Sequence, residues 1–266
     1  SPFTRLYFVT AGSATVQLPS GCHKLTQGHM YLIPAFMQHT DCCTGRFDHY
    51  YIHIYEDSDG PGVLADLDFP VELNGTDHDL HLFRTICEHN ETMRLHTPDP
   101  RIYDNRHSLI ECVRLNRERP IHERMESLGI VYQLLSRFVR LAHPRYESSD
   151  ARIRNALRFI DRNPGETIAL SQLADAAHMS RDHFIRMFYH EVGVTPIRYI
   201  TERKMLRARL QLASTSLPVK DIAASLGYSD FSYFSRIFRK ETLLTPLQYR
   251  ASFNRVPTPG KPLSNS

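Results

Sequence analysis

Two stretches near the end of this 266-residue sequence are copies of each other. The clearer copy spans residues 227–250, GYSDFSYFSRIFRKETLLTPLQYR, and a diverged copy spans residues 179–199, MSRDHFIRMFYHEVGVTPIRY. The shared positions are Phe184, Arg186, Phe188, Glu191, Thr195, Pro196 and Tyr199 in the first copy, and Phe234, Arg236, Phe238, Glu241, Thr245, Pro246 and Tyr249 in the second. Self-similarity at a spacing of about fifty residues predicts a repeated structural unit.

Each copy follows a short apolar helical pattern, LSQLADAAH at 170–178 and VKDIAASLG at 219–227. A brief turn comes next, and Ser180 or Ser229 can cap the second helix by accepting a backbone N–H bond. A helix, a tight turn and a second helix make a helix-turn-helix. One such pattern is common in structural domains, whereas two matching copies indicate a dedicated module.

The second helix of each copy is expected to have one buried and one exposed face. Phe184 and Phe188 lie one turn apart and belong in the core, which places Arg186 on the opposite face. An arginine there can bond guanine bidentately, an isoleucine can meet a thymine methyl group, and an aspartate can accept from cytosine. We therefore expect these faces to enter DNA major grooves; plain solvent exposure or phosphate contact is the alternative for each residue. The candidate DNA-contacting residues are Arg181, Asp182, Ile185 and Arg186 in the first copy, and Phe231, Ser232, Ser235, Arg236 and Arg239 in the second.

A long helix is predicted between the copies. It begins at Thr195 as cap and Pro196 at the first helical position, where a missing N–H costs nothing. Residues 196–213 would form a helix of roughly 27 Å. A spacer of that length can hold two helices at a separation close to the distance between successive major grooves on one face of DNA, which is roughly 34 Å.

Charge separates the front of the chain from the back. Residues 1–149 carry 14 Lys/Arg and 19 Asp/Glu, a net charge of −5, whereas residues 150–256 carry 17 and 10, a net charge of +7. A basic module behind an acidic front suits a polyanion partner, although an uneven solvated surface explains the charge equally well.

Length and composition indicate an ordinary globular protein of one or two domains. The five cysteines form no C-x-x-C pair and are odd in number, which argues against a disulfide framework and a zinc ribbon. A reducing cytoplasm is the expected location. A chain that starts with Ser-Pro is expected to lack its native first residues. The sequence contains no run of 18 apolar residues, so no transmembrane helix is expected.

The front of the chain has the pattern of short antiparallel strands. Runs such as RLYFVT, ATVQL, HMYLIP and FDHYYIHIY alternate in period 2, and turn residues such as AGS and PSG separate them. The predicted fold class is α+β multidomain, with an N-terminal antiparallel β-barrel, a helical linker and a C-terminal all-α domain. The expected domains are a barrel at 1–75, a helical linker and dimerisation region at 76–149, the double helix-turn-helix at 150–253 and a flexible tail at 254–266.

The helical region contains one apolar stripe that must be covered. In the run at 121–143 the stripe comprises Met125, Leu128, Val131, Tyr132, Leu135, Phe138 and Val139. Packing on the barrel and pairing with the same helix of a second chain are both open, and a homodimer is expected. The segment PRYESSD at 144–150 has the composition of a linker.

Polar side chains in the barrel are candidates for small-molecule binding. Such sites combine a few orienting polar groups with apolar walls. By residue type and alternation the candidates are Arg5, Tyr7, Tyr31, His39, Tyr51 and His53. Metal binding by His49 and His53, or by His78 and His81, lacks a third ligand at a recognisable spacing, so no metal site and no cofactor is predicted.

Residues 151–253 resemble the DNA-binding domain of the AraC/XylS family of bacterial transcription regulators. LADAAHMS, FIRMFYHEVGVTPIRYI, the run from Arg203 to Leu210 and DIAASLGYSDFSYFSRIFRKETLLTPLQYR carry the resemblance. The family pattern has glycine three residues before the second Thr-Pro, where this chain has Leu243, so the turn there is expected to differ in shape. The resemblance implies a non-enzymatic regulator of promoter DNA whose N-terminal barrel binds a small effector, a sugar or other metabolite. It also implies a location in the bacterial cytoplasm, with nucleoid association when the protein is bound to DNA. Activation is the commoner behaviour in the family.

The barrel segment also resembles the cupin family through Gly28, Pro34 and His39. Metal-binding cupins add a His-x-His and a glutamate on an earlier strand, whereas the segment after Gly12 is SATVQL, so the resemblance implies the fold and not the metal. Two alternatives remain: a cupin-fold metal-dependent enzyme or metal sensor fused to a DNA-binding module, and an architectural nucleic-acid-binding protein without an effector.

Overall fold

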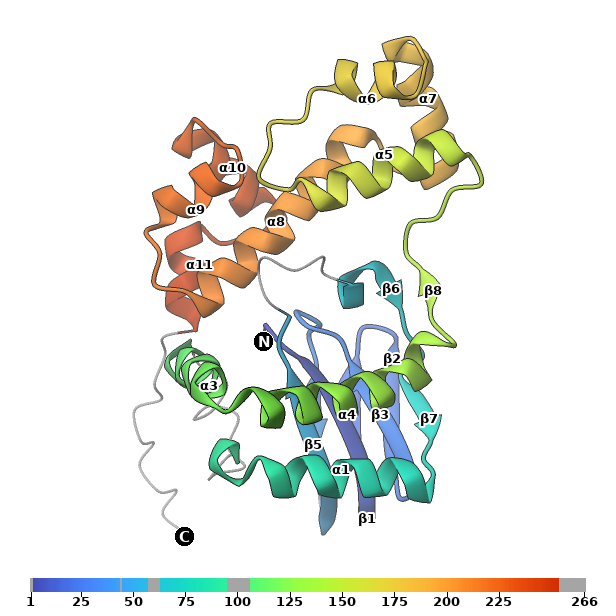
Figure 1. The fold of residues 1–266 in the computed structure, drawn as a ribbon, viewed down its shortest axis with the longest axis vertical. Coiled ribbons are helices and arrows are strands. Elements are labelled where there is room, and N and C mark those ends of the chain that lie inside the picture. The colour runs from blue at the N-terminus through green and yellow to red at the C-terminus, as the bar shows by residue number, and fades with distance from the viewer. Residues whose placement is uncertain (1, 44, 57–62, 95–105, 254–266) are drawn as a thin grey trace, which may run out of the picture. The chain divides into compact units, whose positions relative to one another are not determined.

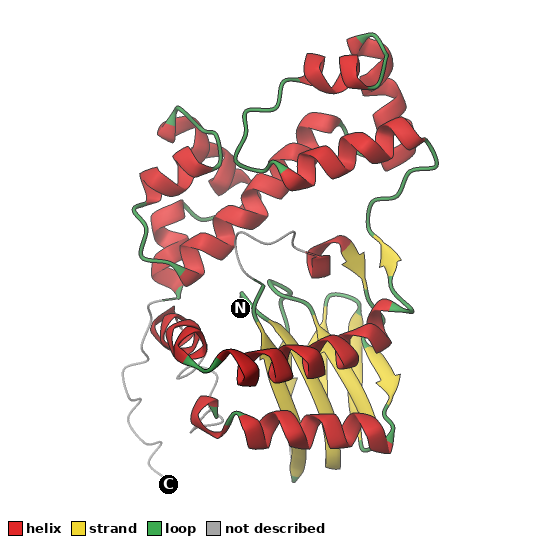
Figure 2. Ribbon diagram, in the orientation of Figure 1, coloured by secondary structure: helices red, strands yellow, loops and turns green. Residues whose placement is uncertain are grey.

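The computed structural model describes residues 2–43, 45–56, 63–94 and 106–253, and the chain divides into two compact units (Figures 1 and 2). The first unit contains residues 1–96 and 111–145, and the second contains residues 97–110 and 146–266. Helix α3 (Arg106–Glu118) contributes to both units. The first unit is strand-rich and the second is helical, as the sequence predicts. No helix in the described ranges is long and apolar enough to cross a membrane.

A curved antiparallel sheet forms the centre of the first unit. Its strands are β1 (Thr4–Leu18), β2 (Gly21–Thr26), β3 (His29–Ile33), β4 (Thr40–Cys42), β5 (Phe47–Ile54) and β7 (Glu72–Asn74). They run in the order β2-β1-β3-β7, and β4 and β5 also pair with β1. The result is a half-barrel built around β1.

Strand β1 corrects the expectation of two strands separated by a turn at Ala11–Ser13. Its first half pairs with β3 and β5, and its second half pairs with β2 and β4. The register against β5 shifts between Val9 and Ala11, and Gly12 has φ 75°. A Cβ at Gly12 would lie 1.9 Å from the carbonyl oxygen of Arg46. The apparent turn signal is therefore a bend inside one continuous strand, which glycine permits.

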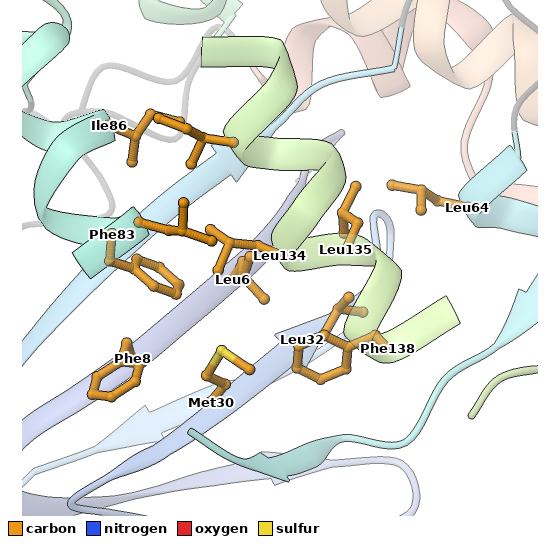
Figure 3. Close-up of a cluster of buried hydrophobic side chains, with 12 residues drawn as sticks. Leu6, Phe8, Met30, Leu32, Leu64, Phe83, Ile86, Leu134, Leu135 and Phe138 are labelled. Carbon is orange, nitrogen blue, oxygen red and sulfur yellow. The ribbon is translucent and has the colours of Figure 1, made fainter. Parts of the chain in front are cut away.

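The two faces of the sheet carry separate cores. Leu6 and Phe8 of β1 point to one face, where α1 (Asp77–His89) and α4 (Ile121–Val139) cover them (Figure 3). The intervening residues Tyr7 and Val9 point to the other face. A capping box of Thr76 and Asp79 starts α1, and Arg137 of α4 forms an ion pair with the buried Asp79, so α1 and α4 are linked across the sheet surface.

Helix α4 is only partly covered by the sheet. Its buried residues are Ile130, Leu134, Leu135 and Phe138. Of the predicted stripe, Met125 is 66% exposed, Leu128 49%, Tyr132 63% and Val139 40%. Of the predicted stripe, Leu135 and Phe138 are therefore buried within the first unit, and Val131 packs against the same core. The helix has two adjacent apolar faces, and the sheet covers one of them.

Short elements complete the first unit. Two 3-10 helices span Val63–Asp66 and Glu91–Met93, and the two-residue strands β6 (Leu67–Asp68) and β8 (His143–Pro144) pair with each other. After β8, the amide of Arg145 donates to the carbonyl oxygen of Asp66 at 2.8 Å. All five cysteines are free thiols.

Besides the start of α3, the described part of the second unit consists of seven helices and the loops that join them. The helices are α5 (Ala151–Arg162), α6 (Leu170–Ala176), α7 (Arg181–Val192), α8 (Pro196–Ser214), α9 (Val219–Ser225), α10 (Phe231–Thr242) and α11 (Pro246–Ser252). The predicted inward face of α5 is confirmed, since Ile153, Ala156, Leu157 and Ile160 are buried. The predicted linker is hydrogen-bonded and not free, because Ser148 and Ser149 donate to Glu191 at 2.8 and 2.9 Å.

Candidate nucleic-acid interface

Helices α6 and α7 form the first predicted helix-turn-helix. The amide of His183 donates to Ser180 Oγ at 3.4 Å, so Ser180 caps α7 as predicted. Phe184 and Phe188 are fully buried, with ring centroids 5.8 Å apart. This pair fixes the rotation of α7 and leaves its opposite face exposed.

Helices α9 and α10 form the second motif, with a different cap from the one predicted. Asp230, and not Ser229, accepts from the amides of Ser232 at 2.7 Å and Tyr233 at 3.2 Å. The turn comprises residues 177–180 in the first copy and 226–230 in the second, so the second turn is one residue longer. The extra residue moves the cap position to Asp230, whose carboxylate also interacts favourably with the helix dipole.

The nine candidate DNA-contacting residues fall into two groups. Six are exposed: Arg181, Asp182, Arg186, Ser232, Arg236 and Arg239. Three are half-buried: Ile185, Phe231 and Ser235. Ile185 packs against the core of the first motif, and the ring of Phe231 lies 6.4 Å from that of Phe234. The half-buried residues therefore lie between the core and the exposed face, and the exposed face is mainly polar and cationic.

The arginines on α7 and α10 are not neutralised by any carboxylate that the structure describes. Within the described ranges, no ion pair involves Arg181, Arg186, Arg236 or Arg239. Arg198 on α8, by contrast, pairs with Glu202 and Glu241 at 2.6 Å each. The guanidinium of Arg236 lies 5.8 Å from the ring centroid of Tyr233, a contact that favours one orientation of the side chain. Exposed and unpaired guanidinium groups can bond phosphate oxygens or guanine edges.

Helix α8 connects the two motifs, and the helix predicted there is confirmed. It spans 19 residues, and the amide of Arg198 donates to Thr195 Oγ1 at 3.3 Å. At about 1.5 Å per residue its length is about 28 Å. Sequence reasoning missed two contacts of this helix, the Arg198–Glu241 pair and the buried Lys204. Lys204 lies one turn before the buried Ala208, so its position on an apolar face was the available signal.

The turn at Leu243 corrects an expectation. Gly193 ends α7 with φ 79° and ψ −7°, and Leu243 ends α10 with φ 65° and ψ −1°. Their amides donate to Tyr189 O at 2.9 Å and to Arg239 O at 2.8 Å. The two turns therefore have the same shape, because the leucine takes up the left-handed conformation that glycine adopts in the first copy.

The candidate small-molecule residues lie together in the first unit. Strand register places Arg5 opposite His53, and Tyr7 opposite Tyr51 and Tyr31, so five candidates share one face of the half-barrel. His39 lies in the loop before β4, close enough to Arg5 and His53 for the charge of Arg5 to act on His39 and for the charge of His39 to act on His53. His53 stacks on Phe3, with ring centroids 4.2 Å apart.

The environment of this face keeps its imidazoles neutral. Burial lowers the pKa of His39 and of His49, and it lowers the pKa of His53 to about 3. The Tyr31 hydroxyl donates to Glu72 at 2.7 Å and its ring is fully buried, whereas Tyr51 is half-buried. Neutral imidazoles and a half-buried tyrosine can both donate and accept hydrogen bonds.

The parts of the chain that the structure describes contain no cluster of side chains that could hold a metal ion. No three His, Cys, Asp or Glu side chains come together there as metal ligands would.

Comparison with known proteins finds matches to part of the chain. The family profile described as "Helix-turn-helix domain" matches residues 173–252. An uncharacterized HTH-type transcriptional regulator of Haemophilus influenzae is 35% identical over 103 residues, which cover 39% of this chain and 35% of that protein. The lactose operon transcription activator of Staphylococcus xylosus is 28% identical over 125 residues, which cover 47% and 45%.

A solved structure also matches part of the chain. It is a transcriptional regulator from Chromobacterium violaceum with an AraC-type DNA-binding domain, 28% identical, with a TM-score of 0.36; the match covers 41% of this chain and 95% of that one. The chain matches less than half the length of the two curated relatives.

Proposed function

We propose that this chain, whose residues 173–252 match a helix-turn-helix domain profile, is a DNA-binding transcription regulator of the AraC/XylS family that reads promoter DNA with two helices. One observation carries the proposal. On α7 and on α10, a fully buried phenylalanine pair fixes the helix so that an exposed arginine projects from the other side, with no carboxylate partner among the described residues. We call α7 and α10 the recognition helices.

Arg186 and Arg236 are the base-reading residues in this proposal. They occupy equivalent positions in the two copies, two residues after a buried phenylalanine. A bidentate arginine–guanine contact contributes about 1–3 kcal/mol of discrimination against the wrong base. Asp182 and Ser232 flank these arginines on the exposed faces, while Arg181 and Arg239 contact phosphates and set the register.

The first unit supplies regulation by a small molecule. The face that carries Arg5, Tyr7, Tyr51, His53 and His39 combines one buried cation, neutral imidazoles and aromatic rings. That mixture suits a metabolite with several hydrogen-bonding groups, such as a sugar, stacked on the aromatic rings. Binding of the metabolite changes promoter occupancy, with activation as the expected sign.

The exposed face of α4 supports a homodimer. Ile121, Met125, Leu128, Tyr132 and Val139 are 71%, 66%, 49%, 63% and 40% exposed. Their spacings of four, three, four and seven residues are those of the positions that face the partner helix in a coiled coil. The same helix of a second chain is therefore the partner that would cover this face.

DNA selection tests the regulator proposal. The full chain is used to select duplexes from a pool of random 30-base-pair DNA, and guanine N7 methylation interference is then measured on the selected duplex. We expect two clusters of interference about 10 base pairs apart on one face of the duplex. A single cluster would contradict reading by two helices, and failure to select any duplex would contradict DNA recognition itself.

A ligand screen tests the small-molecule proposal. A metabolite that binds the native first unit raises its melting temperature in a saturable manner. We expect His53→Ala to abolish that rise for the metabolite that shows it, while the exposed His81→Ala, on α1, leaves it unchanged. An equal rise in both variants would place the ligand elsewhere.

A further inference from the structure

A lysine is buried in the middle of the helix that joins the two motifs. Lys204 of α8 is 6% exposed, and its Nζ donates to Glu166 O at 2.8 Å and to Leu226 O at 2.7 Å. The Nζ atom also lies 5.2 Å from the ring centroid of Tyr228. No carboxylate forms an ion pair with it in the described ranges, and burial lowers the pKa of the ammonium.

The two carbonyl groups belong to different motifs. Glu166 lies in the loop that leads into α6, whereas Leu226 ends α9. Lys204 therefore bonds both halves of the second unit from the helix that connects them.

The two halves also meet backbone to backbone around this lysine. A Cβ at Gly165 would lie 2.7 Å from the carbonyl oxygen of Ser225, and a Cβ at Gly227 would lie 2.8 Å from that of Gly165. Thr167 Oγ1 donates to the Gly227 carbonyl oxygen at 3.2 Å. We call this contact between residues 165–167 and 225–227 the seam. Its closeness leaves no room for the halves to slide against each other.

The stability of the second unit alone does not explain a lysine at this buried position. Burying an ammonium group without a counter-ion is costly, and an apolar side chain of similar volume is often as stabilising. Its specific contribution is directional, because two hydrogen bonds to opposite sides of the seam define one arrangement of the halves. Each half carries one recognition helix, so that arrangement fixes the distance and rotation between α7 and α10.

We propose that Lys204 is a positioning residue that makes the protein selective for the spacing between the two DNA segments it contacts. The inference rests on the proposed function, since it requires both recognition helices to bind one duplex. Each inserted base pair moves the second segment by about 3.4 Å and rotates it by about 35°. A locked pair of helices cannot follow that change, whereas an unlocked pair can.

The experiment measures affinity as a function of spacing. The probes are the duplex selected by the full chain and two derivatives with one or two base pairs inserted between its protected segments. For the wild-type chain we expect the two-base-pair insertion to weaken binding about tenfold or more, since it removes the base contacts of one recognition helix. For Lys204→Met we expect a spacing penalty of less than about threefold, together with weaker binding to the original duplex. Lys220→Met, which removes an exposed lysine from α9, is the matched control and should keep the wild-type ratio.

A merely structural lysine gives a different result. It would lower the affinity of the variant for all three duplexes equally and leave the ratio between them unchanged, which would overturn the inference. Gly165→Ala disturbs the seam without changing Lys204. If Lys204→Met does not fold, the same spacing penalty is measured with Gly165→Ala instead. If the wild-type chain selects no duplex, the proposed function is contradicted directly. That outcome differs from an unchanged spacing ratio, which contradicts only the role of Lys204.

Discussion

Leu243→Gly should stabilise the second unit. Leu243 ends α10 with φ 65°, in the left-handed region, and its side chain is 84% exposed. The equivalent position in the first copy is Gly193, with φ 79°. The leucine therefore holds an unfavourable backbone conformation and gains little burial in return.

The size of the effect follows from two opposing terms. The left-handed conformation costs a residue with a Cβ about 1–2 kcal/mol. Glycine loses more conformational entropy on folding, at a cost of about 0.4–1 kcal/mol. The difference is a net gain of about 1 kcal/mol, which for a unit of this size raises the melting temperature by about 4 °C.

The reciprocal substitution is the control. A Cβ at Gly193 would meet no atom within 4 Å, so Gly193→Leu tests conformation without a clash. It should destabilise by about the same 1 kcal/mol that Leu243→Gly gains. Both variants are compared with wild type by thermal melting of the full chain, followed by far-UV circular dichroism. A lower melting temperature for Leu243→Gly, or no loss for Gly193→Leu, would refute the reasoning.

Three further predictions concern burial and pH. Phe234→Ala should destabilise the second unit by about 3–5 kcal/mol because the ring is fully buried, as urea unfolding will show against the half-buried Phe231→Ala as control. Hydrogen bonds from Ser148 and from Ser149 lower the pKa of Glu191 to about 2 from 4.5, so they stabilise the ionised form. That stabilisation is present above pH 4.5 and is lost as the pH falls towards 2, and Glu191→Gln should flatten this part of the stability profile. Burial lowers the pKa of His53 to about 3 from 6.5, so stability should fall as the pH drops from 6.5 towards 3, and His53→Phe should reduce that fall; an unchanged slope would contradict the burial of a neutral imidazole.

The sequence predicts the second unit well because its signals are local. Helix periodicity, caps and the Thr-Pro signal each act within a few residues, so α5, the pair of motifs and the bounds of α8 could be derived from spacing alone. The cap at Asp230 was missed because a one-residue difference in turn length changes which side chain reaches the free amides. Lys204 was missed because its acceptors come from two distant loops.

The first unit depends more on contacts that are distant in sequence. Period-2 alternation predicts strands, but it does not show that β1 continues through Gly12 or that β4 and β5 both pair with it. Helix α4 shows the same limit, since an apolar pattern indicates a face that needs covering without showing what covers it. Register does bring five of the six candidate ligand residues to one face, which alternation alone could not establish.

Base preference in the two arginine variants tests the central claim most directly. Arg186→Ala and Arg236→Ala are each used to repeat the selection from random DNA, and the preferred base at every position is compared with wild type. We expect each variant to lose preference at one position, with the two positions about 10 base pairs apart, and to bind the original duplex about 1–3 kcal/mol more weakly. Unchanged base preference in both variants would contradict the assignment of α7 and α10 as recognition helices.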